Sequence, residues 1–274
     1  MALTVNTNLA SMNASTHLQS SSRGLSTSLE RLSSGLRINR GADDAAGLGV
    51  ANNLRAANAS LKVAHRNASD AISVIQTAEG STSEVGAIVE RMRELAVQSS
   101  SETLADQERQ YIQEEFTQLL GEIDRIAAIS NFNGVQLSDG TNATLSVQVG
   151  IGSSADNQID ITLGDLGSAT LGVDVLDLST AATAVLALDA FDSAIDTLNG
   201  YHSSYGAVQN RIQSATRNLE TYSDNLGGAE SVIRDADFAL EAAEMAKFQT
   251  MQQAGVSVLA QANQLSQSAL KLLG

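Results

Sequence analysis

Residues 248–273 read FQTMQQAGVSVLAQANQLSQSALKLL, and apolar or small residues recur in this stretch at alternating intervals of three and four. The members of this stripe are Phe248, Met251, Gly255, Val258, Ala262, Leu265, Ala269 and Leu272. Such spacing is typical of a coiled-coil contact line, because it keeps one face of a helix turned toward a partner helix. The stretch therefore predicts a long helix that buries one face against another.

A matching stripe lies near the other end of the chain. Leu25, Leu29, Leu32 and Leu36 follow each other at intervals of four, three and four. The simplest way to bury both stripes is against each other, which predicts that the start and the end of the chain pair. Charge is withheld from both regions, since the first 22 residues and residues 248–270 contain no Asp, Glu, Lys or Arg.

The uncharged C-terminal run is long enough to raise the question of a membrane span. Its many Gln and Asn side chains would be costly in hydrocarbon, so we expect no membrane-spanning helix. The N-terminal run lacks the basic start and compact apolar core of a secretory signal, so we expect no cleaved signal peptide.

Three further stripes with the same spacing predict a helical bundle and a mainly α fold. They are Ile75, Ala78, Thr82, Val85, Val89, Met92 and Ala96; Ile112, Phe116, Leu119, Ile123 and Ile126; and Leu188, Phe191, Ile195, Leu198, Tyr205, Val208, Ile212, Ala215, Leu219, Tyr222 and Leu226.

Between residues 131 and 165 apolar and polar residues alternate, as in Leu145, Val147 and Ile159, Ile161, which predicts a small β-hairpin. Asn133-Gly134 predicts a tight turn at its entrance.

Composition narrows the class of protein. The 274 residues include no Pro, Cys or Trp, so long helices can run without interruption and no disulfide can form. The formal net charge of −15 argues against nucleic acid as a partner. Residues 126–210 carry no Lys or Arg but hold nine Asp, which favours a solvated acidic surface; a calcium site is the alternative, although the EF-hand spacing is absent.

The sequence offers no constellation for catalysis. His17, His65 and His202 are scattered, with no second ligand at metal-binding spacing. The glycine-rich residues 41–49 lack the Lys of a phosphate-binding loop and are interpreted as a break between helices. Glu114 and Glu115 are adjacent and point in different directions on a helix. We therefore expect neither enzyme activity nor a cofactor or metal.

Several motifs in order resemble those of bacterial flagellin. They are SSGLRIN at residues 33–39, ADDAAGL at 42–48, RELAVQ at 93–98, NFNG at 131–134 and QQAGVSVLAQAN at 252–263. The resemblance spans roughly residues 1–165 and 185–274. It implies a structural subunit that polymerises into the flagellar filament for motility, outside the cell. A hook–filament junction protein of the same superfamily and a soluble coiled-coil binding module are the alternatives.

The resemblance also implies a domain layout. Residues 1–42 and 234–274 would form a terminal coiled-coil domain that builds the inner tube of the filament. Residues 43–233 would form a helical core domain, with the β-hairpin at about 131–165 and a short exposed tip at about 165–186. Leu25, Leu29, Leu32, Leu36, Met251, Val258, Leu265 and Leu272 would pack the terminal helices and the subunits.

Partners and contact residues follow from the same resemblance. Flagellins are exported unfolded through the filament channel, which suggests that Gln252, Gln253, Gln261, Gln264 and Gln267 line an uncharged channel wall; the alternative is that some of them bond to neighbouring subunits. Expected partners are copies of the chain itself, an export chaperone at the C-terminal segment, and the filament cap and hook-associated proteins. A host toll-like receptor is a further expected partner, through Arg91, Leu95 and Glu115.

Overall fold

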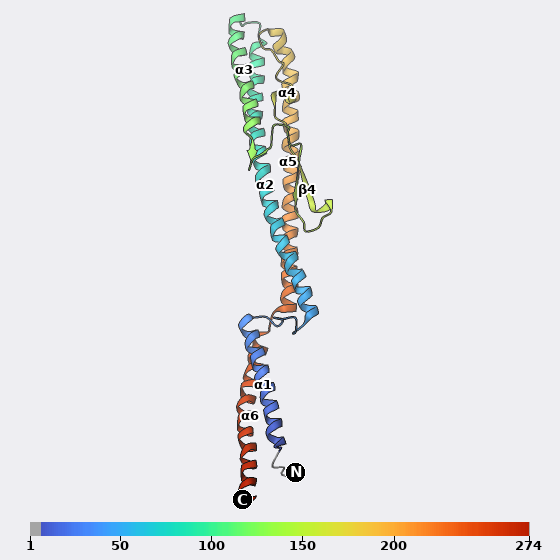
Figure 1. The fold of residues 1–274 in the computed structure, drawn as a ribbon. Coiled ribbons are helices and arrows are strands. Elements are labelled where there is room, and N and C mark those ends of the chain that lie inside the picture. Colours follow the sequence, from blue (N-terminus) through green and yellow to red (C-terminus); the bar gives the residue numbers. More distant parts are fainter. Residues whose placement is uncertain (1–6, 274) are drawn as a thin grey trace. The chain divides into compact units, whose positions relative to one another are not determined.

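The structure is a computed structural model that describes residues 7–273, with side chains described as far as residue 264. The chain divides into two compact units: one holds the chain up to Ala57 together with the part from Asn225 onward, and the other is Asn58–Asp224. The helices are α1 (Leu9–Ser34), α2 (Ala45–Ser99), α3 (Asp106–Ile129), α4 (Ser168–Leu171), α5 (Ala181–Arg234) and α6 (Phe238–Leu273), with a short 3-10 turn η1 (Ala155–Asn157) (Figure 1). The prediction of a mainly α fold is confirmed.

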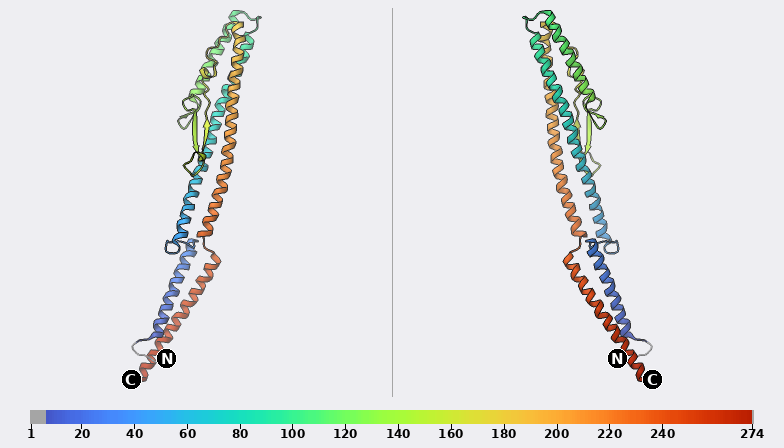
Figure 2. Two further views of the ribbon diagram at one scale, coloured as in Figure 1. Left: turned by 90° about the vertical axis from the view of Figure 1, so that its right-hand side faces the viewer. Right: turned by 90° about the vertical axis from the view of Figure 1, so that its left-hand side faces the viewer.

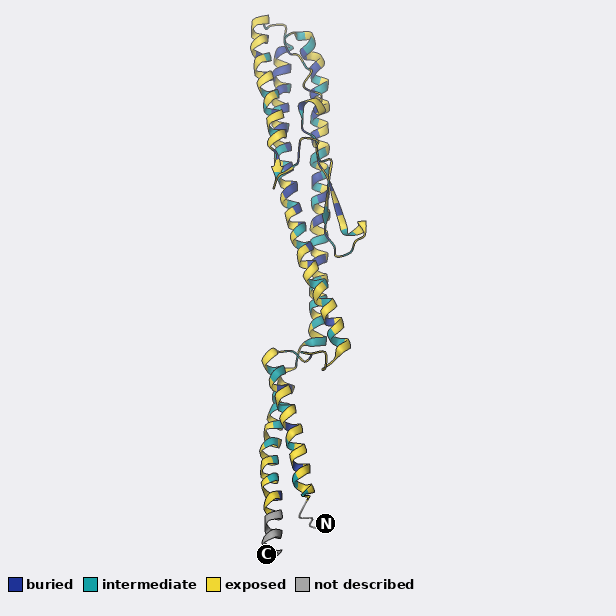
Figure 3. Ribbon diagram, viewed as in Figure 1, coloured by how far each residue is buried: buried dark blue, intermediate teal, exposed yellow. Residues whose placement is uncertain are grey.

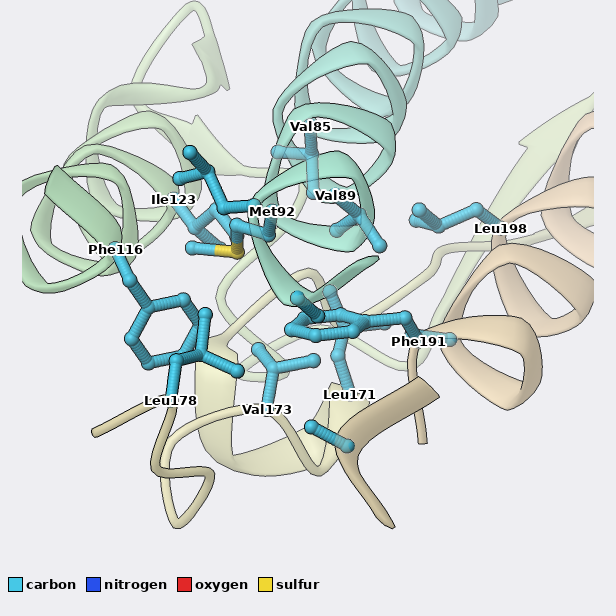
Figure 4. Close-up of a cluster of buried hydrophobic side chains, with 14 of the residues drawn as sticks. Val85, Val89, Met92, Phe116, Ile123, Leu171, Val173, Leu178, Phe191 and Leu198 are labelled. Carbon is cyan, nitrogen blue, oxygen red and sulfur yellow. The ribbon is translucent and has the colours of Figure 1, made fainter. Parts of the chain in front are cut away.

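In the unit Asn58–Asp224, α2 and α5 run side by side and carry the remaining elements (Figure 2). The predicted stripe on α2 is confirmed, since all seven of its residues are buried. Ile112, Phe116 and Ile123 of α3 are buried as well. Side chains from α2, α3, α5 and the segment before α5 meet in one hydrophobic cluster (Figure 4). Within it the Phe116 and Phe191 rings pack edge to face, with 6.1 Å between the ring centroids. Packing of these stripes holds the three long helices together.

The predicted β-hairpin is confirmed. Strands β3 (Thr144–Gln148) and β4 (Gln158–Thr162) pair antiparallel, with Leu145 opposite Ile161 and Val147 opposite Ile159. The apolar face of this hairpin joins α2 and α5 in a second hydrophobic cluster. Because side chains alternate between the two faces of a strand, Ser146 and Asp160 point to the opposite side, where they form a hydrogen bond.

The turn at the entrance is a second, smaller hairpin. Strands β1 (Asn131–Phe132) and β2 (Val135–Gln136) pair with Phe132 opposite Val135, which leaves two residues in the loop. Asn133 and Gly134 have φ angles of 49° and 83°. Both angles lie in the left-handed region that a type I′ turn requires, and Asn-Gly is the pair best suited to it.

The segment between β4 and α5 differs from the exposed tip expected at about 165–186. It contains α4 and buries Leu166, Leu171, Val173 and Leu178 in the first hydrophobic cluster (Figure 4). Ser99 of α2 donates a hydrogen bond to the carbonyl of Leu178. The segment therefore covers the core with its apolar residues, while Ala169, Thr170, Asp174, Val175 and Asp177 remain exposed.

The break between α1 and α2 begins earlier than the glycine-rich stretch 41–49 suggested. Helix α1 ends where Gly35 adopts φ 71°, a left-handed C-cap. The Asp43 carboxylate accepts backbone hydrogen bonds from Arg40 and Asn39, which hold the pKa of that carboxyl below its usual value. Asp44 caps the first turn of α2 through the Gly47 N–H. Carboxylate caps therefore shape this loop, and Gly47 lies inside α2.

Candidate functional site

Helices α1 and α6 pair in antiparallel fashion. Near one end, the Asn8 amide donates to the Ala262 carbonyl at 3.0 Å and the Ser11 hydroxyl donates to Asn263 Oδ1 at 3.0 Å. At the other end, Arg31 forms an ion pair of 2.9 Å with Glu241. The expected pairing of the two charge-free regions is therefore present in the structure.

The contact line between the two helices, called here the α1–α6 seam, follows the three-and-four spacing on each helix. On α1 it comprises Ser11, Ala14, Leu18, Ser21, Leu25, Ser28 and Leu32, which are buried or half-buried. On α6 it comprises Glu241, Met245, Phe248, Gln252, Gly255, Leu259 and Ala262, again buried or half-buried. Polar and small residues thus occupy many positions of the seam.

The seam differs from the one read in the sequence. Met251, Val258 and Leu29 lie outside it and are 46%, 51% and 48% exposed. Phe248, Gly255 and Ala262 lie seven residues apart, and a coiled-coil seam includes one further residue between each two of them. That residue can lie three positions on, at Met251 and Val258, or four positions on, at Gln252 and Leu259. The more apolar choice is Met251 and Val258, whereas the structure uses Gln252 and Leu259.

The remaining predicted packing residues lie at different places. Leu25 and Leu32 belong to the α1–α6 seam, and Leu36 lies beyond the end of α1, where it is half-buried and bridges to Asp235. The Leu265 and Leu272 side chains lie outside the described residues.

Large apolar side chains instead occupy the outside of the helix pair, where Figure 3 shows α1 and α6 to be mostly exposed. The exposed set, called here the outer apolar set, is Leu9, Met12, Leu29, Phe238, Leu240, Met251, Val256 and Val258. A helix pair whose seam mixes apolar with small and polar residues, and which leaves further large apolar residues exposed, presents surface that other chains can cover.

The predicted channel-lining glutamines fall into two groups. Gln253, Gln261 and Gln264 are exposed, and with about 3.6 residues per turn they lie on the side of α6 away from the α1–α6 seam. Gln252 is half-buried on the seam face, between Phe248 and Gly255. Gln252 therefore faces α1 in this structure, and the Gln267 side chain lies outside the described residues.

The predicted receptor-contact residues are only partly at the surface. Arg91 of α2 donates two hydrogen bonds to Glu115 of α3, the shorter of 2.9 Å, and a third to Glu94. The hydrogen bond to Glu115 raises the pKa of Arg91, so the guanidinium stays charged. Leu95 is 1% exposed and belongs to the hydrophobic core. The Leu95 side chain therefore packs inside the hydrophobic core and does not point outward.

Arg109 is a structurally important residue that the sequence analysis did not single out. Its side chain is buried, and its guanidinium donates to the carbonyls of Ser99, Ser101 and Leu104. The sequence gives no local signal for this role, because the three acceptors are backbone groups of the loop between α2 and α3.

The described residues 7–273 also bear on metal binding and on membrane insertion. Within that part of the chain, no group of three or more His, Asp or Glu side chains is arranged to hold a metal ion. None of the described helices has the length and apolar character needed to cross a bilayer.

The comparisons with known proteins agree with the motifs. Residues 5–143 match the bacterial flagellin N-terminal helical region, and residues 188–273 match the bacterial flagellin C-terminal helical region. The flagellin of Halalkalibacterium halodurans is 42% identical over 269 residues, which cover 98% of this chain and 99% of the relative.

The chain belongs to the bacterial flagellin family.

Further similar proteins cover different shares of this chain. The flagellin of Bacillus subtilis is 39% identical over 301 residues, covering 98% of this chain and 99% of that one. The crystal structure of Bacillus cereus flagellin, at 28% identity, covers 56% of this chain and 88% of that chain with a TM-score of 0.50. A putative flagellar hook-associated protein from Vibrio parahaemolyticus reaches a TM-score of 0.59 over 70% of this chain and 99% of that chain, but at 15% identity this likeness concerns the fold alone.

The two flagellin regions include both helices of the α1–α6 pair, as well as α2, α3 and most of α5. The pairing of α1 with α6 therefore joins the N-terminal and the C-terminal flagellin regions within one compact unit.

Proposed function

We propose that this flagellin is a structural subunit that polymerises with copies of itself into the flagellar filament, outside the cell. The observation that carries the proposal is the distribution of side chains on the α1–α6 pair. Ser21, Ser28 and Gln252 lie in the seam, while the outer apolar set faces outward. Covering such residues with neighbouring copies removes apolar area from water, which favours association.

The scarcity of charge on these helices supports the same role. Burying an unpaired charge in a subunit interface is expensive, so helices that become enclosed by other copies are best left neutral. The one ion pair that joins α1 to α6 among the described residues is Arg31–Glu241, near the end of α1 that adjoins Gly35. Residues 1–42 and 234–274, which contain the paired helices α1 and α6, are accordingly proposed as the domain that forms the inner tube, and residues 43–233 as the core domain.

The exposed glutamines of α6 are proposed to line the channel of that tube. Gln253, Gln261 and Gln264 lie on the side of α6 away from α1, so in the assembled tube they would point into a central channel while the opposite face packs. A wall of neutral amides would hold a passing unfolded chain of either charge only weakly. Export of the unfolded chain through this channel, and its binding by a chaperone at the C-terminal segment, belong to the same proposal, as do contacts with the filament cap and hook-associated proteins.

The proposal assigns the chain no catalytic activity. His65 pairs with Glu220 and His202 with Glu79, in each case between α2 and α5. Each pair links two helices. Among the described residues, no hydroxyl side chain is hydrogen-bonded to the imidazole or to the carboxylate of either pair. The arrangement is therefore better suited to helix packing than to general acid–base chemistry.

A second role, recognition by a toll-like receptor, is favoured by the exposed ion pair between Arg91 and Glu115. Both side chains are about half exposed and lie on one surface formed by α2 and α3. Replacing Arg91 with Ala is expected to reduce activation of receptor-bearing cells. Arg125→Ala is the matched control, because Arg125 also forms an exposed pair on α3, with Glu122. Equal activation by Arg91→Ala and the parent would contradict this role.

Polymerisation tests the main proposal. Purified chain treated with a precipitating salt is expected to form long filaments of uniform width in negative-stain electron microscopy. A chain that remains monodisperse in sedimentation under the same conditions would instead match the soluble coiled-coil binding module.

A further inference from the structure

Two glycines of the α1–α6 pair each lie against a large side chain of the opposite helix. A Cβ atom at Gly24 of α1 would stand 2.5 Å from Cζ of Phe248 on α6. A Cβ atom at Gly255 of α6 would stand 3.2 Å from Cδ1 of Leu18 on α1, and 3.9 Å from its Cα. The first site is filled by an aromatic ring, and at the second the two helices approach closely.

The two contacts are reciprocal. Helix α1 contributes one large residue and one glycine, Leu18 and Gly24, and helix α6 contributes Phe248 and Gly255 in the complementary order. Because the helices are antiparallel, both large residues meet their glycines at the same time in one alignment. Sliding one helix by seven residues preserves the hydrophobic spacing but separates the partners.

Each slide has a specific cost. If α6 slides along α1 until Gly24 comes opposite Gly255, a void is left where the Phe248 ring packed. In the other direction Phe248 comes beside Leu18, so two large side chains compete for one space. Voids and overpacking both destabilise a packed interface.

The small seam residues of α1 distinguish these alignments poorly. Ala14, Ser21 and Ser28 recur every seven residues and are all small, so a slide by one heptad replaces one small residue with another. The Ser21 hydroxyl bonds to the His17 carbonyl of its own helix and makes no demand on α6. Between the Arg31–Glu241 ion pair at one end and the Asn8 and Ser11 hydrogen bonds at the other, the alignment therefore depends on the few positions that differ in size.

We propose that the Gly24–Phe248 and Leu18–Gly255 pairs determine the register in which α1 and α6 associate. The register also decides which residues of the outer apolar set stand beside one another, so its consequence for polymerisation rests on the proposed function. The register itself is a property of the helix pair and can be measured without filaments.

Cysteine cross-linking measures the register, because the chain contains no native cysteine. Ser11→Cys with Asn263→Cys reports the observed alignment, since those two side chains are hydrogen-bonded. Ser11→Cys with Val256→Cys reports a slide by one heptad. Both pairs are treated with a short bis-maleimide, and the intramolecular yield is measured on the soluble chain and on filaments.

Three backgrounds then test the size match. Gly24→Leu is expected to lower the yield of the 11/263 cross-link about tenfold relative to the parent, because the new side chain overpacks the Phe248 ring. Phe248→Ala in the same chain is expected to restore most of that yield, since it makes the space that the leucine needs. Gly49→Leu is the matched control: Gly49 lies in α2 of the same unit, and no heavy atom comes within 4 Å of its Cβ position.

The outcomes separate the two proposals. A parent that cross-links at 11/256 as well as at 11/263, or a Gly24→Leu chain with the parent's 11/263 yield, overturns the register assignment. So does a failure of Phe248→Ala to restore the yield. A parent that shows the 11/263 preference but forms no filaments supports the register assignment and contradicts the proposed function.

Discussion

Arg109 illustrates how one buried cation shapes a connection between two helices. Its Nε donates to the Ser99 carbonyl at 3.0 Å, and its two terminal nitrogens donate to Leu104 at 2.8 Å and Ser101 at 2.7 Å. These carbonyls lie at the end of α2 and in the loop to α3, where no helical N–H is available to them. The guanidinium satisfies them together and so fixes the path of the loop.

Removing this side chain should destabilise the unit Asn58–Asp224. Arg109→Ala removes the donor to the Ser99 and Leu104 carbonyls, whereas the Ser101 carbonyl keeps the Leu104 N–H, and we expect the free energy of unfolding to fall by about 3 kcal/mol. Denaturant unfolding monitored by circular dichroism measures the change. Arg125→Ala serves as the control, because that guanidinium pairs only with Glu122 in an exposed turn of α3; equal effects of the two substitutions would contradict the role given to Arg109.

The ion pair between Asp192 and Arg93 makes the stability of the fold depend on pH. Arg93 of α2 donates to Asp192 of α5 at 2.6 Å, and this hydrogen bond lowers the pKa of the carboxyl from its usual 3.8. A group with a lowered folded-state pKa contributes stability above its unfolded pKa, and that contribution is lost as the pH falls through the folded value. Asp192→Asn should therefore unfold more easily than the parent at neutral pH. Below the lowered pKa the two unfolding midpoints should converge, and a difference that stays constant down to that pH would contradict the assignment.

At the scale of elements, α2 and α5 each carry glycines with no packing requirement. Gly80 and Gly86 of α2, and Gly200 and Gly206 of α5, have no heavy atom within 4 Å of a Cβ position. They lie where the two hydrophobic clusters of the unit Asn58–Asp224 meet. Glycine inside a helix costs stability relative to alanine, because the unfolded chain loses more backbone freedom on folding.

Alanine at these positions should stabilise the unit. Each of Gly80→Ala and Gly200→Ala is expected to raise the free energy of unfolding by about 0.5–1 kcal/mol. Gly164→Ala is the contrasting variant, since a Cβ there would stand 2.6 Å from the Tyr201 ring. Thermal unfolding of the three variants should therefore show opposite shifts, and a destabilised Gly80→Ala would argue against open space at that position.

The elements also show what the sequence could predict and where it failed. The stripes on α2, α3 and α5 were predictable because their polar faces leave one apolar face to bury. The pairing of α1 with α6 was predictable for the same reason, but its seam was not. Phe248 and Gly255 fit two adjacent faces of α6, and the size match with Gly24 and Leu18, which selects one of them, appears only when the helices are placed together.

The burial of Leu166, Leu178 and Leu95 could not be predicted from the sequence for a related reason. Leu166 and Leu178 belong to a short segment without helical or strand periodicity, so nothing local indicates that they enter the core. Arg91 and Glu115 are charged residues that the structure brings together at the surface, whereas Leu95, which lies off the predicted stripe, is buried in the first hydrophobic cluster. A motif carried over from a family identifies positions, and burial then decides which of them can be touched.

For the whole molecule, the two units differ in how much of their apolar surface they cover. The unit Asn58–Asp224 encloses two hydrophobic clusters. The unit that contains the α1–α6 pair keeps small polar residues in its seam and leaves the outer apolar set exposed. A single chain therefore completes one core and leaves the other surface to be covered, which is the arrangement expected of a subunit that polymerises.

The critical concentration for polymerisation tests this claim most directly when Met251 and Val258 are both replaced by serine. The two substitutions keep the seam intact and remove apolar surface that faces outward. We expect the critical concentration to rise at least about tenfold, because each lost apolar contact weakens subunit association. Val175→Ser, which removes an even more exposed apolar side chain before α5, is the control. Polymerisation of the double variant at the parent's critical concentration would contradict the account.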